Sequence, residues 1–116
     1  MQKVERWRIK QLESNLKDIA SLLLKFGHPE WANVFLHYAE EAQGIYLARR
    51  FPVWQLKNLI RNIRFCFKQS SSLFNIPLQV IHNGRQSQKE IELVAEFHSL
   101  FHLLAELEEK LKEKIH

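Results

Sequence analysis

Apolar residues recur at alternating steps of three and four residues near both ends of this chain. The first repeat runs through Ile9, Leu12, Leu16, Ile19, Leu23 and Phe26. This spacing puts one apolar side chain per turn on the same face of an α-helix, as in the seam of a coiled coil. It predicts a first helix over about residues 3–26 that buries this face against another helix.

A second repeat of the same kind occupies the C-terminal part of the chain. It passes through Val94, Phe97, Phe101, Leu104, Glu108, Leu111 and Ile115, with Glu108 as an acidic interruption. We therefore expect the longest helix to run from about residue 87 to the C-terminus. Basic residues gather at the start of the first helix and acidic residues near the end of the last. Antiparallel packing would bring these opposite charges, and the two termini, side by side.

Two more helices are predicted between these seams. Gly27 can adopt the left-handed conformation that ends a helix, and Pro29 suits the first turn of the next one. The second helix is expected to end at Gly44 or before Pro52, and a third to cover about residues 53–68. The expected buried faces are Trp31, Val34, Phe35, Tyr38 and Ala42, and then Leu56, Leu59, Ile60, Ile63, Cys66 and Phe67.

The fold class follows from these elements and from the length of the chain. Three glycines and three prolines are too few to punctuate a sandwich or barrel of many strands. A chain of 116 residues fits one ordinary domain. We therefore expect a single all-α domain over residues 1–116. It would be a bundle of four main helices, with a short irregular or helical segment before the long C-terminal helix.

Positive charge is concentrated in the middle of the chain. Residues 42–89 contain eight basic and no acidic residues, whereas residues 90–116 contain three basic and seven acidic ones. Within the third helix, Lys57, Arg61, Arg64 and Lys68 are spaced to fall within about 60° of one face. Like charges at this spacing repel one another by a few tenths of a kcal/mol per pair, roughly 0.2–0.5.

Aromatic residues accompany this basic stripe. Trp54 and Phe65 fall beside the cations rather than on the apolar arc, and Arg49 and Arg50 precede the helix. One interpretation is a docking surface for an acidic partner, with arginine forming paired hydrogen bonds and the aromatic rings as anchors. The other is a solvated helix face that the acidic last helix partly neutralises. The predicted partner-binding residues are Arg49, Arg50, Trp54, Lys57, Arg61, Arg64, Phe65 and Lys68.

Catalytic and metal-binding patterns are weak. Cys66 falls on the buried arc of its helix, which favours an inert thiol. His98 and His102 have the spacing of two metal ligands, but two ligands are too few, and only His37, Glu40 and Glu41 could join them. Arg61 and Asn62 resemble the start of the active-site motif of HEPN-type RNases, yet Cys66, Phe67 and Lys68 stand where the histidine should be. We expect no enzymatic activity, no metal and no cofactor.

Three stretches resemble a family of small helical bacterial domains that has no characterised function. The first is the segment 22–32, in which a leucine-rich helix ends at Gly27 and Trp31-Ala32 opens the next helix. The second runs from Ile63-Arg64-Phe65 to Leu78, although Lys68, Gln69 and the serines 70–72 replace most of the family's glycines and Ile76 replaces an aspartate. The third is the segment 97–101. The resemblance covers about residues 20–110 and implies a likeness to bacterial immunity proteins, which neutralise toxins by direct binding.

The leading prediction is therefore a non-enzymatic, cytoplasmic immunity protein, or antitoxin, that binds a toxin domain. Such a protein could use its acidic C-terminal helix instead of the basic stripe. The alternative is a nucleic-acid-binding module in which the stripe contacts phosphates and Trp54 or Phe65 stacks on bases. A third possibility is self-assembly through the first and last helices. We expect a monomer or homodimer and no membrane association, since no apolar stretch is long enough to span a bilayer.

Overall fold

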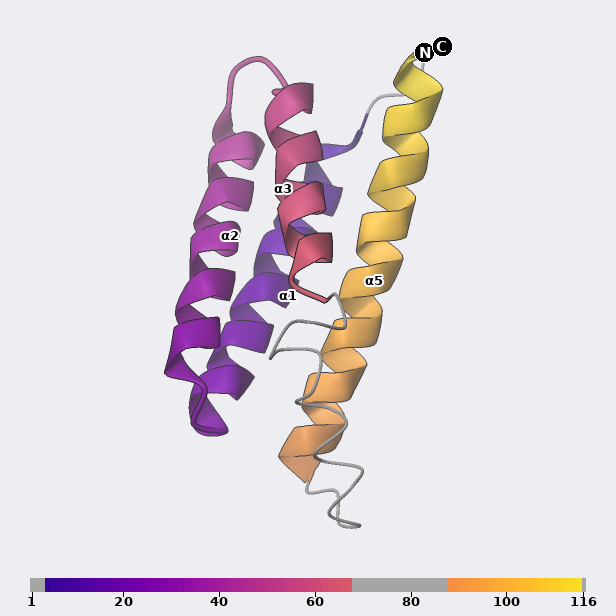
Figure 1. Ribbon diagram of the computed structural model, residues 1–116. Coiled ribbons are helices and arrows are strands. Elements are labelled where there is room, and N and C mark those ends of the chain that lie inside the picture. The colour runs from indigo at the N-terminus through magenta and orange to yellow at the C-terminus, as the bar shows by residue number, and fades with distance from the viewer. Residues whose placement is uncertain (1–3, 68–87, 116) are drawn as a thin grey trace.

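The computed structural model describes residues 4–67 and 88–115, which form four α-helices and no β-strand. The helices are α1 (Arg6–Lys25), α2 (Pro29–Leu47), α3 (Val53–Phe65) and α5 (Gln88–Ile115). Successive helices run in opposite directions, so α1 begins and α5 ends at the same end of the bundle (Figure 1). The prediction of an all-α bundle with four main helices is confirmed. The short segment expected before the last helix lies outside the described residues.

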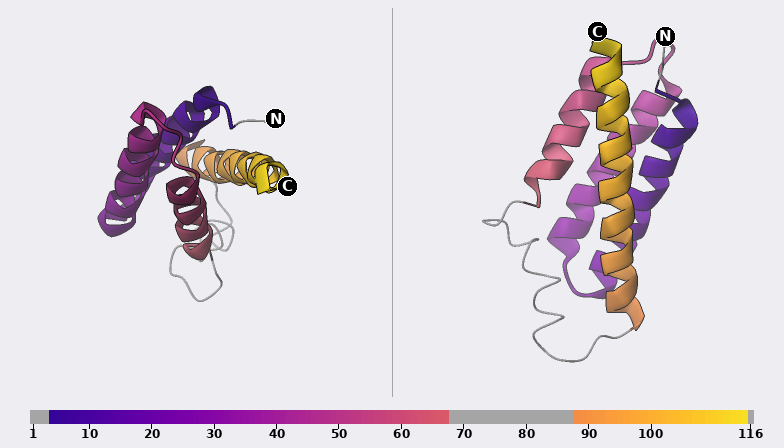
Figure 2. Two further views of the ribbon diagram at one scale, coloured as in Figure 1. Left: turned by 90° about the horizontal axis from the view of Figure 1, so that it is seen from above. Right: turned by 90° about the vertical axis from the view of Figure 1, so that its right-hand side faces the viewer.

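The helices pack as a ring in which each one has two neighbours. Helix α1 packs against α2 and α5, and α3 packs against the same two helices on the opposite side (Figure 2). Arg8 of α1 forms an ion pair with Glu106 of α5, which joins the basic start of the first helix to the acidic part of the last. Asn15 adds a second link, because its Nδ2 donates to the backbone oxygen of Glu96 at 3.2 Å. The expected antiparallel pairing of α1 and α5 is thus confirmed.

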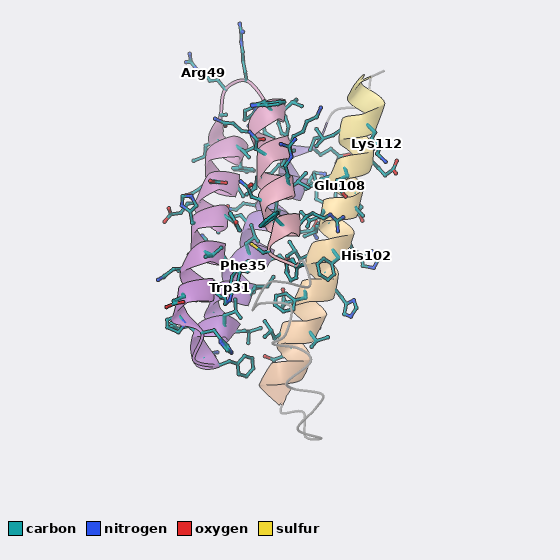
Figure 3. The ribbon with its side chains drawn as sticks, in the orientation of Figure 1. Trp31, Phe35, Arg49, His102, Glu108 and Lys112 are labelled. Carbon is teal, nitrogen blue, oxygen red and sulfur yellow. The ribbon has the colours of Figure 1, made fainter. Side chains whose placement is uncertain are left out.

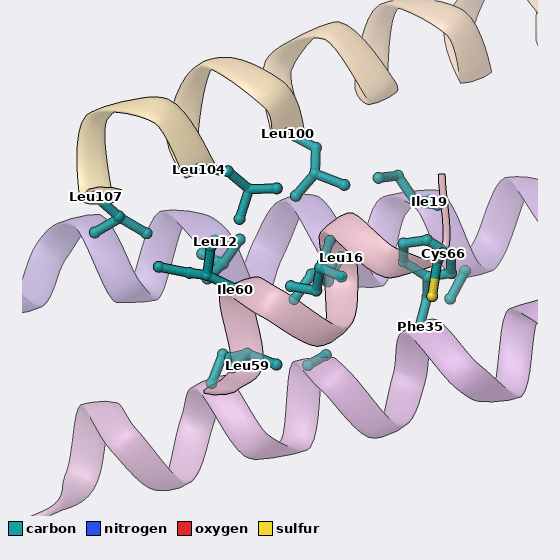
Figure 4. Close-up of a cluster of buried hydrophobic side chains, with 14 of the residues drawn as sticks. Leu12, Leu16, Ile19, Phe35, Leu59, Ile60, Cys66, Leu100, Leu104 and Leu107 are labelled. Carbon is teal, nitrogen blue, oxygen red and sulfur yellow. The ribbon is translucent and has the colours of Figure 1, made fainter. Parts of the chain in front are cut away.

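The core is a single apolar layer shared by all four helices. The seam residues Ile9, Leu12, Leu16, Ile19 and Leu23 of α1 are all fully buried, as their spacing predicted. They meet Phe35 from α2, Leu59 and Ile60 from α3, and Leu100, Leu104 and Leu107 from α5 (Figure 4). The apolar faces of α1 and α5 therefore pack against each other within one chain.

The seam predicted for α5 is confirmed at Phe97, Leu104 and Leu111 and is wrong at Val94, Phe101 and Glu108, which are only partly buried. The buried seam passes instead through Leu93, Phe97, Leu100, Leu104, Leu107 and Leu111, and Leu103 is buried as well. The observed seam keeps the alternating spacing but contains no charge. It is favoured because burying the Glu108 carboxylate would cost several kcal/mol, on the order of a desolvated ion. Glu108 instead lies on the flank of α5 that faces α3.

A glycine cap ends α1, as expected. Gly27 has a φ of 80°, and the His28 and Gly27 amides donate to the Leu23 and Leu24 carbonyls at 2.9 and 3.1 Å. This is the Schellman pattern, which satisfies carbonyls that have no partner within the helix. Pro29 then occupies the first turn of α2. The sharp corner between α1 and α2 follows directly from these three residues, Gly27, His28 and Pro29.

Helix α2 continues past Gly44 and ends at Leu47, so of the two expected ends the one in the segment before Pro52 is confirmed and the one at Gly44 is wrong. Ile45 is 2% exposed, and its burial extends the apolar face of α2 by another turn. Arg6 of α1 caps this end of α2, because its Nη1 donates to the backbone oxygen of Tyr46 at 2.5 Å and its Nη2 donates to the backbone oxygen of Arg49 at 3.3 Å.

Within the described residues, no helix is both long and apolar enough to cross a bilayer.

Glu13 is a buried carboxylate on α1 whose ionised form the fold stabilises. It is 2% exposed and forms ion pairs with Lys17 at 2.9 Å and Lys10 at 3.3 Å. The hydrogen bond from Lys17 is the largest cause that lowers the pKa of this carboxyl below its usual value, against the opposing effect of burial. A carboxyl whose pKa is lower in the folded than in the unfolded chain stabilises the fold at pH values above the pKa that it has in the unfolded chain.

We therefore expect Glu13→Gln to lower the free energy of unfolding by about 1 kcal/mol at neutral pH. The difference from the native chain should shrink as the pH falls below about 4.3 and vanish below the folded pKa, since both side chains are then neutral. Urea unfolding followed by circular dichroism at neutral and acidic pH measures it. The exposed Glu40→Gln is the control and should show little effect at either pH. A Glu13→Gln penalty that persists unchanged in acid would contradict this account.

Candidate functional site

The outer face of α3 presents two aromatic rings with a guanidinium between them. Trp54 and Phe65 are 68% and 65% exposed, and Arg61 is exposed as well. Because each residue of an α-helix advances by about 100°, these three side chains fall within an arc of about 40°. The arc lies opposite the buried side chains of α3, so it points directly away from the core. We call Trp54, Arg61 and Phe65 the α3 ridge.

The two flanks of the ridge differ in chemistry. On the side of α5, Lys57 and Arg64 border the ridge with positive charge. On the side of α2, the amides Asn58 and Asn62 border a groove of about 440 Å³ that also contains Glu41. The cationic part of α3 is therefore narrow, and a carboxylate of a neighbouring helix lies along each side of it.

The remaining predicted residues are not all part of the ridge. Arg49 and Arg50 are exposed in the connection between α2 and α3, at the end of the bundle next to the start of α3 (Figure 3). Of the three ridge residues, Trp54 is the nearest to these arginines along the chain and Phe65 is the farthest. Lys68, the last member of the predicted stripe, lies outside the described residues.

Arg64 is already paired within the chain. Its Nε donates to Glu108 Oε2 at 3.2 Å and its Nη2 donates to Glu108 Oε1 at 2.6 Å. This two-pronged geometry is the strongest form of arginine–carboxylate contact. Helix α5 thus neutralises part of the basic stripe, which is one of the two interpretations that the sequence left open. Arg61 and Lys57, by contrast, form no ion pair with any residue that the structure describes.

The Arg64–Glu108 pair should contribute modestly to stability. Both side chains are about 40% exposed, 41% and 39%, so water screens the attraction. A double-mutant cycle with Arg64→Ala and Glu108→Ala should give a coupling of about 0.5–1 kcal/mol, measured by urea unfolding. The same cycle on Lys25, in the last turn of α1, and Glu108 is the control and should give a coupling near zero. Equal couplings for Arg64 and Lys25 would contradict the pairing.

A groove between α3 and α5 adjoins the ridge. It has a volume of about 440 Å³ and is lined by Lys57, Ile60 and Arg61 from α3 and by Glu108, Leu111 and Lys112 from α5. Glu108 and Lys112 follow one another along the same side of α5 (Figure 3). The groove brings a lysine of the last helix next to the basic stripe of the third.

The sequence predicted that the acidic last helix neutralises part of the stripe, but it did not place Lys112 beside α3. With the seam assigned through Glu108, Lys112 had no predicted place beside α3. The register through Leu100, Leu104 and Leu107 puts both Glu108 and Lys112 on the flank facing α3. The sequence signal for these two positions was the second possible apolar repeat of this helix, through Leu100, Leu104 and Leu107, which contains no charged residue.

Cys66 lies in the turn after α3 and is buried, as predicted. Its Sγ lies 3.5 Å from the Tyr38 hydroxyl and donates to the Asn62 carbonyl oxygen at 3.4 Å. Burial raises the pKa of the Cys66 thiol and is also the main cause that raises the pKa of Tyr38. The thiolate form that a nucleophile or a metal ligand requires is therefore disfavoured.

The two histidines at metal-ligand spacing do not converge with others. His98 and His102 are both exposed on α5, and His37 of α2 forms its contact with Glu41 on the same helix at 3.1 Å. Across residues 4–67 and 88–115, no group of three or more histidine, cysteine or acidic side chains is arranged to hold a metal ion.

Comparison with known proteins does not assign this bundle to a group. No family model, no curated protein and no solved structure matches the chain. The resemblance of the segments around Gly27, Arg64 and Phe97 to a bacterial helical family therefore stays a prediction.

Proposed function

We propose that this protein is a non-enzymatic protein-binding protein that uses the α3 ridge to contact its partner. The observation that carries the proposal is the exposure of Trp54 and Phe65 on either side of Arg61, on a helix whose opposite face is buried. Tryptophan and arginine are the residues most enriched among binding hot spots. A partner that covered the exposed parts of the two rings would remove that apolar area from water.

The partner that we propose is a toxin, which this chain would neutralise by direct contact in the bacterial cytoplasm. Support comes from the likeness of the segment 22–32 to the immunity-like helical domains described above. A well-packed bundle suits such a role because the binding surface is formed before contact, so little ordering entropy is lost. The proposal requires no chemical step, and the raised pKa of Cys66 agrees with that.

Nucleic acid is the alternative partner, and Lys57 and Arg61 are the observation that favours it. Their charges are not paired within the described chain, and the exposed Trp54 could stack on a base. A phosphate backbone, however, carries charge at every nucleotide and needs a continuous positive track. Glu108 on one flank and Glu41 on the other border the cations of α3 and would repel such a backbone. This arrangement favours a protein partner.

Affinity capture with and without nuclease separates the two partners. The tagged chain is used to capture partners from a bacterial lysate, and the bound material is identified by mass spectrometry. We expect one protein, in stoichiometric amount, that remains after nuclease treatment. Expressed alone, that protein should stop growth, and co-expression of this chain should restore it. Loss of all bound material on nuclease treatment would overturn the proposal in favour of nucleic acid.

A further inference from the structure

We propose that the groove between α3 and α5 receives a carboxylate side chain of the partner protein. This inference rests on the proposed function, because it specifies the chemistry of the surface that the partner presents. The groove is lined by Lys57, Ile60, Arg61, Glu108, Leu111 and Lys112 and has a volume of about 440 Å³. The groove lies beside the α3 ridge and is large enough to hold one side chain of a partner protein.

The balance of charge in the groove favours an incoming anion. Lys57, Arg61 and Lys112 each carry a positive charge and line the same groove. The groove's own carboxylate, Glu108, is held by both prongs of Arg64. None of these three cations pairs with a carboxylate in the part of the chain that the structure describes. A carboxylate placed among them would relieve their mutual repulsion and gain charge-assisted hydrogen bonds.

The floor of the groove adds an apolar component. Ile60 and Leu111 are each 4% exposed, so each is almost covered by the core while still lining the groove. An apolar floor lowers the local dielectric constant, which strengthens the attraction between a bound carboxylate and the cations. It also packs against the methylene groups of a glutamate. The expected partner segment therefore carries a glutamate flanked by apolar side chains.

The same geometry disfavours a phosphodiester in the groove. A carboxylate brings one negative charge to Lys57, Arg61 and Lys112. A nucleic-acid strand brings a run of charges that needs a continuous positive track, and the carboxylates Glu108 and Glu41 interrupt that track on either side of α3. The groove therefore matches an isolated acidic side chain better than a charged backbone.

A short peptide tests the inference before the partner is known. The probe is a blocked pentapeptide of the sequence Ser-Leu-Glu-Leu-Ser, titrated into the isotope-labelled full chain and followed by nuclear magnetic resonance. We expect saturable shifts at the backbone amides of Lys57, Arg61 and Lys112. The same peptide with glutamine in place of glutamate should bind at least about tenfold more weakly, since it loses the charge-assisted contacts.

Two charge reversals serve as variant and control. Lys112→Glu should weaken binding of the glutamate peptide at least about tenfold. Lys25→Glu makes the same change in the last turn of α1 and should leave binding unchanged. Equal affinities for the glutamate and glutamine peptides, or native affinity in Lys112→Glu, would overturn the inference. Shifts produced by single-stranded oligothymidylate but not by the peptide would overturn it as well and assign the groove to phosphate.

Failure of this inference is distinguishable from failure of the proposed function. If the peptide test fails while a nuclease-resistant protein is captured, only the carboxylate groove is wrong and the α3 ridge remains the contact. If no protein is captured after nuclease treatment, the proposed function is wrong whatever the peptide does.

Discussion

Phe35→Ala should lower the free energy of unfolding by about 3–5 kcal/mol, the range for removing a large buried aromatic side chain. Phe35 is fully buried, and its ring makes edge contacts with Tyr38 and Phe67 at centroid distances of 6.0 and 6.2 Å. The contact with Phe67 joins α2 to the turn that follows α3. Since domains of this size are stable by only about 5–15 kcal/mol, the variant should lose a large share of its free energy of unfolding.

The neighbouring residue provides the control for Phe35. Leu36 belongs to the same helix but is 44% exposed on its outer face. Leu36→Ala should change the free energy of unfolding by less than about 0.5 kcal/mol. Urea unfolding followed by circular dichroism compares the two variants. Similar penalties for Phe35→Ala and Leu36→Ala would contradict the assignment of the core.

Trp54→Ala should weaken binding of the captured partner by about 2 kcal/mol or more, which is roughly a 30-fold rise in Kd. Trp54 is 68% exposed in the free chain, so its replacement should leave the free energy of unfolding within about 0.5 kcal/mol of the native value. A large effect on binding with a small effect on stability is the signature of a contact residue. Isothermal titration with the purified partner measures the first, and urea unfolding the second.

Leu24→Ala is the matched control for Trp54. Leu24 is 62% exposed, close to the value for Trp54, but it belongs to the last turn of α1, and α1 ends at the end of the bundle opposite to the one where α3 begins (Figure 1). Removing it should not change the affinity. If Leu24→Ala weakens binding as much as Trp54→Ala, the loss reflects exposed apolar area in general and the ridge is not the contact.

The α-helical fold could be predicted from the sequence because its signals are local. The spacing of Ile9, Leu12 and Leu16 fixes which face of α1 is buried, and Gly27 with Pro29 fixes where α1 turns into α2. Each of these signals involves residues within one or two turns of each other. The same holds for the exposed ridge, since the wheel of α3 separates Trp54 and Arg61 from the apolar arc.

What the sequence did not predict depends on contacts between distant segments. The end of α2 is set partly by Arg6, which donates a hydrogen bond to the backbone oxygen of Tyr46, 40 residues further along the chain. The register of α5 had two versions with similar spacing, and the structure has the uncharged one, which leaves Glu108 on the flank where Arg64 of α3 pairs with it. The groove with Lys112 depends on that choice. Partial neutralisation of the stripe by the last helix was among the predictions, but the specific pair of Arg64 with Glu108 depends on the same choice of register.

This pairing changes how the basic stripe is tested. Reversing Arg64 would break its contact with Glu108 as well as any contact with a partner, so a loss of binding would have two explanations. Arg61 has no ion pair within the described chain, and its reversal acts on the partner alone. Arg61 is therefore the residue on which the stripe should be judged.

The most direct test of the account is side-by-side capture by the native chain, Arg61→Glu and Lys25→Glu from the same nuclease-treated lysate. Both variants change the net charge by the same amount, and both altered residues are exposed. We predict that the native chain and Lys25→Glu retain the same protein and that Arg61→Glu loses most of it, because a reversed charge at the centre of the ridge would repel an acidic partner. Equal retention by all three chains would contradict the claim that the α3 ridge binds the partner.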